Sequence, residues 1–295
     1  GPFHAWQWMF ISMIVPAAIY FLLALTLPES PRYLVAINAG DRAKTVLESI
    51  FVEPVESKIA AIRASLDAEE KSKLSDLRAK GSGLLPIVWI GLALAIFQQF
   101  VGINAVFYYS NLIWEAVGYP PTEAFTTSTI ISIVNVVFTV VAILLVDRIG
   151  RKPLLLIGSA GMAVSLGVIA YVFESAPQNA QDAPELTHTS GIVAVVALNA
   201  FVAFFASTWG PVVWVLLGEM FPNSIRAAAM SVTVMANWIA NFIVSETFPE
   251  LVHVGLGIAY GLFTLFAVLS FVFTWKWVKE TRGAELEDMA ALEQV

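Results

Sequence analysis

The sequence predicts an all-α membrane protein with several spans, and three observations support this fold class. The chain has 295 residues, of which 58% are hydrophobic and only 13% are charged, whereas soluble globular chains carry roughly 45–50% apolar and about 25% charged residues. Seven stretches are long enough to cross a bilayer as a helix, which takes about 20 apolar residues. Basic residues gather in alternate loops, as in multi-span proteins. A water-soluble domain is therefore excluded.

The seven apolar stretches follow one another along the chain. They cover roughly 6–27, 85–112, 125–146, 153–173, 191–217, 227–248 and 254–278. One such stretch could be a buried helix of a soluble protein, but seven in series could not. We therefore expect a helix over 1–27, a six-helix transmembrane bundle over 85–278 and a tail over 279–295.

The one long polar segment, 28–84, separates the first two stretches. Helix starts are predicted at Pro31, Asp41 and Pro54, because proline at the first helical position and aspartate at the cap favour a start. Ile59, Ile62 and Leu66 share one side of the last of these helices. We interpret the segment as a cytoplasmic helical linker that packs on other helices, with a solvated charged linker as the alternative.

The distribution of charge predicts the topology. Of the 16 Lys and Arg residues, nine lie between the first and second stretches, three between the third and fourth, one between the fifth and sixth, and three at the C-terminal end. Because basic loops stay in the cytoplasm, the C-terminus is expected inside and the N-terminus outside. The loops of the outer side carry only acids. A chain that begins outside, directly on a span and without Met, fits a piece of a longer protein.

Several function classes are disfavoured by composition. There is no Cys, and the three His residues are far apart (His4, His188 and His253), so neither a metal centre nor another cofactor is expected. The net charge of −7 disfavours nucleic acid as a partner. No paired carboxylates and no Ser/His/Asp set lie at membrane depth, so an enzyme is not expected.

Neutral amides and aromatic residues take the place of charge inside the stretches. The second carries Gln98, Gln99 and Asn104, followed by Tyr108 and Tyr109. Further such residues on later stretches are Asn135, Trp209, Trp214, Asn237, Trp238 and Asn241. Amides donate and accept hydrogen bonds at once and so match hydroxyls, and aromatic faces pack against the C–H side of a sugar ring. The set predicts a site for a neutral polyhydroxylated solute. The alternative is that amides join helices to one another.

Two helix breaks are expected near these amides. At about 100° per residue, Asn104 lies roughly 120° around a straight helix from Gln98, so one ligand could not meet them all. Gly102 lies between them and could unwind the helix. Pro211, after Gly210, lacks an N–H and suggests a second break. Transporter sites are commonly built from such discontinuous helices.

Charged residues at the predicted cytoplasmic ends form a second candidate cluster. Arg148 and Arg151 lie between the third and fourth stretches, and Glu219 and Arg226 lie between the fifth and sixth. Ion pairs among them could hold helix ends together in one conformation and separate in another. Because exposed pairs contribute little, such a latch needs partial burial.

The chain resembles the sugar porter family of the major facilitator superfamily, and most closely its bacterial sugar–proton symporters of the xylose–proton type. Five short motifs in order carry the resemblance: 28–34 (PESPRYL), 98–104 (QQFVGIN) with Tyr108 and Tyr109, 147–152 (DRIGRK), 209–219 (WGPVVWVLLGE) and 280–283 (ETRG). The resemblance implies a twelve-helix protein. In that frame, 6–27 matches the sixth helix, 85–278 the C-terminal six-helix bundle, and the first five helices are missing.

The resemblance and the residue patterns described above together predict roles for individual residues. Those expected to bind the sugar are Gln98, Gln99, Asn104, Asn135, Trp214, Asn237 and Trp238. Those expected to gate the site are Tyr108, Tyr109, Gly102, Gly210 and Pro211. Those of the inner salt-bridge cluster are Glu29, Arg32, Arg148, Arg151, Glu219 and Arg226.

The implied function is transport of a monosaccharide, a hexose or a pentose, by alternating access in the plasma membrane. The expected partners are the sugar, the lipid bilayer, the missing N-terminal half and, for proton coupling, protons. Two alternatives stay open. One is a facilitated porter of a polyol such as inositol, since the same amides serve any polyol. The other is a membrane sugar sensor that does not transport.

Overall fold

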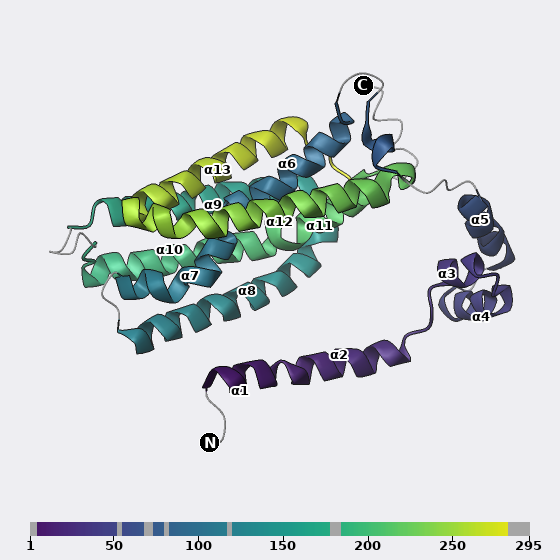
Figure 1. Cartoon of the computed structure of the whole chain (residues 1–295), viewed down its shortest axis with the longest axis horizontal. Helices are drawn as coiled ribbons and strands as arrows, with labels where there is room; N and C mark the ends of the chain where they lie inside the picture. The colour runs from purple at the N-terminus through teal and green to yellow at the C-terminus, as the bar shows by residue number, and fades with distance from the viewer. Residues whose placement is uncertain are drawn as a thin grey trace. The chain divides into compact units, whose positions relative to one another are not determined.

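The computed structural model describes residues 5–51, 55–67, 73–79, 83–116, 120–177 and 184–282. The chain divides into two compact units, Gly1–Lys71 and Ser72–Val295, and each is described by itself (Figure 1). Every regular element in the described ranges is a helix, apart from isolated bridge residues such as the pair Arg78 and Leu84. The all-α class expected from the sequence is therefore confirmed.

The first unit begins with an apolar helix in two parts, α1 (Ala5–Ser12) and α2 (Ile14–Thr26). The interruption at Met13 lies one turn before Pro16, which has no N–H to donate to the carbonyl of Ser12. The apolar part of this region, Phe10–Thr26, is shorter than the spans of the second unit. The first predicted stretch, 6–27, is thus helical but interrupted.

Three short helices follow in the same unit. They are α3 (Pro31–Ala36), α4 (Gly40–Ile50) and α5 (Val55–Asp67). Asn38, in the left-handed region at φ 58°, reverses the chain between α3 and α4. Their small core holds Leu34, Val35 and Ala43, with Ile59 and Ile62 of α5 packed against it. The apolar side predicted for the last linker helix is therefore used in packing, while the side chain of Leu66 lies outside the described residues.

The second unit begins before the predicted bundle boundary at residue 85. A 3₁₀ turn, η1 (Leu74–Leu77), places Leu77 in the main hydrophobic core with 1% of its surface exposed. The backbone N–H of Leu85 donates to the carbonyl of Leu77 at 2.8 Å. The last part of the predicted linker therefore packs on the bundle, including α12 (Asn223–Val254).

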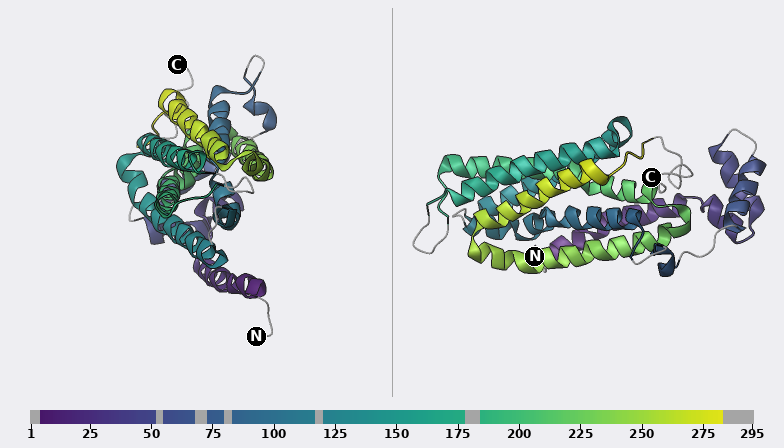
Figure 2. Two further views of the ribbon diagram at one scale, coloured as in Figure 1. Left: turned by 90° about the vertical axis from the view of Figure 1, so that its left-hand side faces the viewer. Right: turned by 90° about the horizontal axis from the view of Figure 1, so that it is seen from above.

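Six apolar spans form the rest of the second unit, and two of them are broken. The helices are α6 (Pro86–Phe100) continued by α7 (Ile103–Ala116), α8 (Pro121–Ile149), α9 (Arg151–Glu174), α10 (His188–Ser207) continued by α11 (Trp209–Met220), α12 and α13 (Leu256–Trp277). Figure 2 shows them running side by side as one bundle. By length and composition all six could cross a membrane, in agreement with the sequence prediction for this region.

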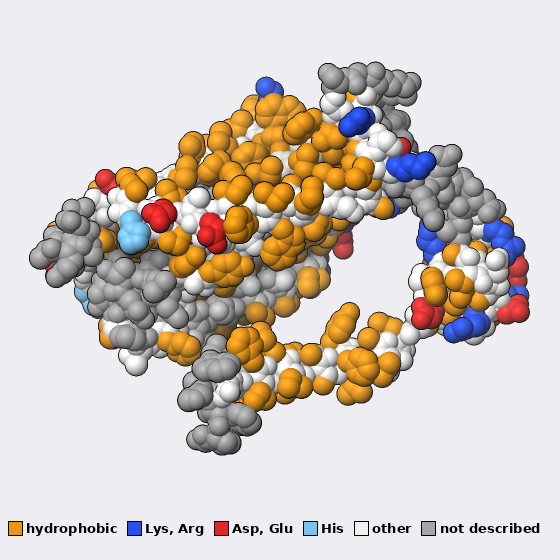
Figure 3. All heavy atoms as spheres, in the orientation of Figure 1, with side chains coloured by type: hydrophobic (Ala, Val, Ile, Leu, Met, Phe, Trp, Pro, Cys, Tyr) orange, Lys and Arg blue, Asp and Glu red, His pale blue; other side chains and the backbone are white. Residues whose placement is uncertain are grey.

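Small residues bring α9 close to its neighbours, as the glycines of this stretch predict. A Cβ at Gly161 would lie 2.3 Å from the ring of Phe204, and one at Gly158 would lie 1.9 Å from Oγ1 of Thr208. Both contacts are to α10 or the break that follows it. Outside, hydrophobic side chains cover most of the visible surface of the bundle (Figure 3), as expected for helices in lipid.

The two breaks differ in their cause. Gly102 has φ +85°, and a Cβ there would lie 2.4 Å from the ring of Phe263, so both the backbone and the space favour glycine. The second break falls at Thr208, which has φ −138° and ψ −86°, and not at Pro211. Pro211 lies in the first turn of α11, where a missing N–H removes no helical hydrogen bond.

Candidate functional site

Four amide side chains meet between the last turn of α6, the start of α7 and the middle of α12. Nδ2 of Asn104 donates to Oε1 of Gln99 at 2.6 Å, and Nε2 of Gln99 donates to Oδ1 of Asn237 at 3.1 Å. Nδ2 of Asn237 donates in turn to Oε1 of Gln98 at 2.9 Å. Gln98, Gln99 and Asn237 are buried, with 3%, 7% and 4% of their surfaces exposed. We call this set the amide chain.

Main-chain carbonyls end the amide chain. Nε2 of Gln98 donates to the carbonyl of Trp209 at 2.9 Å and to that of Gly210 at 3.2 Å. Nδ2 of Asn237 also donates to the carbonyl of Ala95 at 2.9 Å. The amide chain therefore runs from Asn104 to the first turn of α11. It joins the two broken spans to α12.

The break at Gly102 makes this arrangement possible. In a straight helix Asn104 would lie roughly 120° around the axis from Gln98. Because α6 ends at Phe100 and α7 starts at Ile103, the amide of Asn104 can turn back toward Gln99. The helix break expected at Gly102 is present, and the amides around it bond to one another and join helices; their role in sugar binding stays a prediction.

Hydrogen bonds within the amide chain leave a definite set of free donors and acceptors on its four side chains. An amide has two N–H donors and two acceptor positions on its oxygen. Gln98 and Asn237 each use both donors on protein acceptors. Gln99 and Asn104 each use one donor and keep one. An oxygen with free acceptor capacity remains on every member, so the site can both accept from and donate to hydroxyls.

The other predicted binding residues make no hydrogen bond to the amide chain among the described residues. Asn135 is half-buried near the middle of α8, and its side-chain amide bonds to no residue in the described part of the chain. Trp214 on α11 and Trp238 on α12 have 36% and 64% of their surfaces exposed. These three side chains are therefore at least partly accessible.

The two predicted gating tyrosines take different positions. The hydroxyl of Tyr109 donates to the carbonyl of Ser245 on α12 at 3.0 Å, and its ring lies 5.3 Å from that of Phe248. Tyr108, on the other side of α7, is exposed. Tyr109 therefore ties α7 to α12, while Tyr108 is free of such a contact among the described residues.

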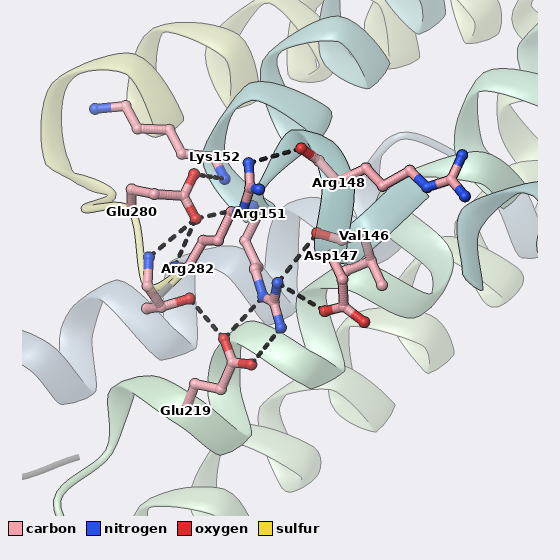
Figure 4. A network of polar contacts seen from close by, with 9 residues as sticks. Val146, Asp147, Arg148, Arg151, Lys152, Glu219, Glu280 and Arg282 are labelled. Carbon is pink, nitrogen blue, oxygen red and sulfur yellow. Dashed lines mark hydrogen bonds and ion pairs between the residues drawn. The ribbon is translucent and has the colours of Figure 1, made fainter. Parts of the chain in front are cut away.

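A charged network ties three spans together at the end of the bundle where α8 meets α9. The Arg151 guanidinium donates to Glu219 from Nε at 3.0 Å and from Nη2 at 2.7 Å. Its Nη1 lies 3.1 Å from the carboxylate of Asp147 and donates to the carbonyl of Val146 (Figure 4). The side chain of Arg151 is 10% exposed and that of Glu219 is 32% exposed. This pair therefore has the partial burial that a latch requires.

Glu280 and Thr281 belong to this network, although sequence reasoning did not include them in the cluster. The hydroxyl of Thr281 donates to Glu219 at 2.6 Å. The Glu280 carboxylate accepts from the backbone N–H groups of Arg151 and Lys152, at the start of α9, at 2.9 and 3.0 Å (Figure 4). Glu280 thus caps a helix that starts far away in sequence.

The environment of Glu280 changes its acidity. Burial alone would raise the pKa of this carboxyl. Hydrogen bonds from the backbone N–H groups of Arg282, Arg151, Lys152 and Thr281 outweigh burial and hold the pKa below its ordinary value of 4.5. The carboxylate is therefore charged at neutral pH, as a cap on a helix N-terminus should be.

The remaining members of the predicted salt-bridge cluster do not join Arg151 and Glu219. Nε of Arg226 donates to the carbonyl of Phe221 at 3.0 Å, and its buried Nη2 has no hydrogen-bond partner among the described residues. Arg148 contributes its backbone carbonyl to Arg282, at 2.6 Å, and its side chain is exposed. Glu29 and Arg32 belong to the first unit, which is described by itself. The expected Arg226–Glu219 ion pair is absent because Arg226 turns toward the carbonyl that ends α11.

A six-span helical bundle with two broken spans and a polar site between them defines a class of protein, the multi-pass membrane transporters. Within the described ranges no group of His, Cys, Asp and Glu side chains could hold a metal ion. The sugar (and other) transporter family model matches residues 3–292. The chain belongs to this family of the major facilitator superfamily, whose named relatives below are transporters and not enzymes.

Individual relatives agree with the family. The chain is 49% identical over 287 residues to the glucose transport protein of Synechocystis, covering 97% of this chain and 61% of that protein. It is 38% identical over 295 residues to the D-xylose-proton symporter of Escherichia coli, covering 97% and 57%. The structure of XylE, a proton:xylose symporter, bound to 6-bromo-6-deoxy-D-glucose matches with a TM-score of 0.77 and 37% identity, over 97% of this chain and 59% of that one. The chain thus spans less than two thirds of these relatives.

Proposed function

We propose that this chain is the C-terminal half, with the preceding helix and the linker, of a transporter that carries a monosaccharide by alternating access. The amide chain is the observation that carries this proposal. It offers two N–H donors and four oxygens with acceptor capacity beside two broken spans, which is the chemistry that a ring of hydroxyls requires. The relatives named for glucose and xylose transport support the same substrate class.

The proposed sugar-binding set keeps all seven residues predicted from the sequence. Gln98, Gln99, Asn104 and Asn237 form the polar floor. Asn135 brings an amide that needs a partner, because an unsatisfied polar group in a membrane is costly. Trp214 and Trp238 offer exposed indole faces for the C–H side of the sugar.

Gating and the charged network complete the proposed cycle. Tyr108, Tyr109, Gly102, Gly210 and Pro211 are the proposed moving elements, since they flank the two breaks. We place the charged network around Arg151 and Glu219 at the cytoplasmic end, together with the C-terminus, because the basic loops lie at that end. Its ion pairs would hold one conformation and part in another. Glu29, Arg32, Arg148 and Arg226 would join it through contacts with the missing half.

Proton coupling is proposed from the relatives named as proton symporters. No acidic residue lies in the central part of the six apolar spans of this chain. The coupling carboxylate would therefore lie in the N-terminal half of the transporter. It also follows that this chain alone, reconstituted in liposomes, should give no saturable sugar flux.

The deciding experiment uses the complete gene product that contains this chain. In proteoliposomes, uptake of labelled glucose, xylose and galactose is followed with and without an inward proton gradient. Accumulation above equilibrium that disappears when the gradient collapses would support proton symport. Equilibration that ignores the gradient would support a facilitator. Uptake of inositol alone would replace the sugar by a polyol, and sugar binding without any flux would support a sensor.

A further inference from the structure

Trp209 connects the amide chain to the opposite side of the bundle. It is fully buried at the first position of α11. Its indole N–H lies 3.0 Å from the carbonyl of Leu155 and 2.9 Å from the hydroxyl of Ser159, both on α9. Its own carbonyl accepts from Nε2 of Gln98. One residue thus holds α9 with its side chain and the amide chain with its backbone.

The surface of α9 is shaped to receive this residue. A Cβ at Gly158 would lie 1.9 Å from Oγ1 of Thr208 and 3.0 Å from Cδ1 of Trp209, so glycine leaves the room in which the break sits. The hydroxyl of Ser159 also bonds to Ser270 on α13 at 2.9 Å, which fixes the acceptor. Leu155, Gly158 and Ser159 therefore form a socket for the start of α11.

The carbonyls of Trp209 and Gly210 decide which way the amide of Gln98 points, and the carbonyl of Ala95 supports the matching orientation of Asn237. The two ends of a side-chain amide have nearly the same shape, so only the neighbouring donors and acceptors set its orientation. A main-chain carbonyl only accepts, and it therefore requires the NH₂ end of Gln98. The oxygen of Gln98 must then face Asn237, and the oxygen of Asn237 must face Gln99. The orientation is passed on to Asn104.

We propose that Trp209 is a positioning residue of the ligand site, which fixes the orientation of the amide chain through its carbonyl while its indole is held by Leu155 and Ser159. With this orientation Gln98 and Asn237 accept hydrogen bonds from a ligand but donate none. Gln99 and Asn104 keep one donor each. The site therefore selects a ligand whose hydroxyl at the Gln98–Asn237 end is a donor. The ligand class rests on the proposed function.

The competing explanation is that Trp209 only fills space in the core. Loss of packing would lower the stability of the folded protein. It would also lower the affinity for every sugar by the same factor. Loss of orientation would instead change the ratio between sugars, because Gln98 could turn its NH₂ end toward the ligand. The ratio therefore separates the two explanations.

The experiment measures ligand affinity of the complete gene product in lipid nanodiscs by calorimetry, for the best-bound sugar and for its monofluoro analogues. Fluorine occupies the place of a hydroxyl but cannot donate. In the unmodified protein, fluorination at one position should weaken binding by about fivefold or more, the loss expected for a hydrogen bond. In Trp209→Phe, which keeps a ring but loses the N–H, this penalty should fall below about twofold. Trp275→Phe, at an exposed tryptophan of α13, is the matched control and should keep the full penalty.

Ser159→Ala tests the hydrogen bond of the Trp209 indole N–H with a smaller change. It replaces Trp209→Phe in the experiment if that variant does not fold. It removes one of two acceptors, so the fluorine penalty should fall part of the way. In the Trp209→Phe background it should have no additional effect on the penalty. An unchanged penalty in both single variants would overturn the proposal, as would an unmodified protein that binds all fluoro analogues equally. A protein that binds no sugar or polyol at all would overturn the proposed function and this inference together.

Discussion

Arg151 and Glu219 form a two-pronged ion pair, with Nε–Oε2 and Nη2–Oε1 distances of 3.0 and 2.7 Å. The first residue starts α9 and the second lies in the last turn of α11. Because Thr281, beyond α13, donates to the same carboxylate, one glutamate holds three helix ends. The planar guanidinium is suited to this task, since it presents two parallel donors to a carboxylate.

Replacing Arg151 by Lys should show how much depends on this fork. Lysine keeps the charge but offers a single point of contact. We expect Arg151→Lys to lose about 1–2 kcal/mol of stability, the range for hydrogen bonds to a charged group reduced for the exposure of Glu219. The melting temperature of the purified transporter in nanodiscs measures it. Arg63→Lys, at an exposed site of α5 that belongs to no part of this network, is the control and should leave the melting temperature unchanged. Equal melting curves for all three proteins would contradict a stabilising role of the two-pronged Arg151–Glu219 ion pair.

Glu280 should make stability depend on pH in the acidic range. Its pKa in the folded protein lies below the ordinary value of 4.5, so its stabilising contribution is complete above pH 4.5 and is lost as the pH falls through the folded pKa. Glu280→Gln should therefore melt at a lower temperature than the unmodified protein at pH 7, and the gap should close as the pH falls below 4.5. Glu250→Gln, at an exposed site, should show no gap at either pH. A gap that stays constant with pH would contradict the role of the charge.

Much of the second unit could be predicted from the sequence, because long apolar stretches between polar loops leave few alternatives to spanning helices. The break at Gly102 was also predictable, since amides on different sides of one helix could meet only if it unwound. The break at Thr208 was placed three residues late. Proline breaks a helix because it lacks the N–H that an interior position would donate. In the first turn of the next helix that N–H has no helical partner, so proline is accepted there.

The contacts that sequence reasoning missed are those between residues far apart in the chain. Glu280 accepts from Arg151 and Lys152 across about 130 positions, and the sequence alone gives no distance between them. Arg226 was grouped with Glu219 because both lie near the same helix ends. The structure turns Arg226 toward the carbonyl of Phe221, a backbone acceptor that no side-chain pattern reveals.

Alanine substitutions at Asn237 and Asn135 should separate effects on sugar affinity from effects on stability. Asn237 bonds to two other members of the amide chain, Gln98 and Gln99, and to the carbonyl of Ala95, so Asn237→Ala leaves buried groups unpaired and should lower both stability and sugar affinity. Asn135 has no side-chain partner in the described ranges, so Asn135→Ala should lower affinity by about tenfold at most, for one lost ligand contact, with an unchanged melting temperature. Calorimetry and thermal melting of the same samples test this. A loss of stability in Asn135→Ala would mean that its amide has a structural partner.

Gly102 provides the sharpest test of the broken helix. Its φ of +85° is a conformation that side chains rarely adopt, and a Cβ there would meet the ring of Phe263 at 2.4 Å. Gly102→Ala should therefore cost about 1–3 kcal/mol, or the chain should straighten and move Asn104 away from Gln99. The first response lowers the melting temperature, and the second lowers sugar affinity, because the amide chain loses Asn104. Gly218→Ala is the matched control, since no atom lies within 4 Å of its added Cβ and alanine favours a helix. If both variants melt and bind sugar like the unmodified protein, the break at Gly102 has no part in forming the site.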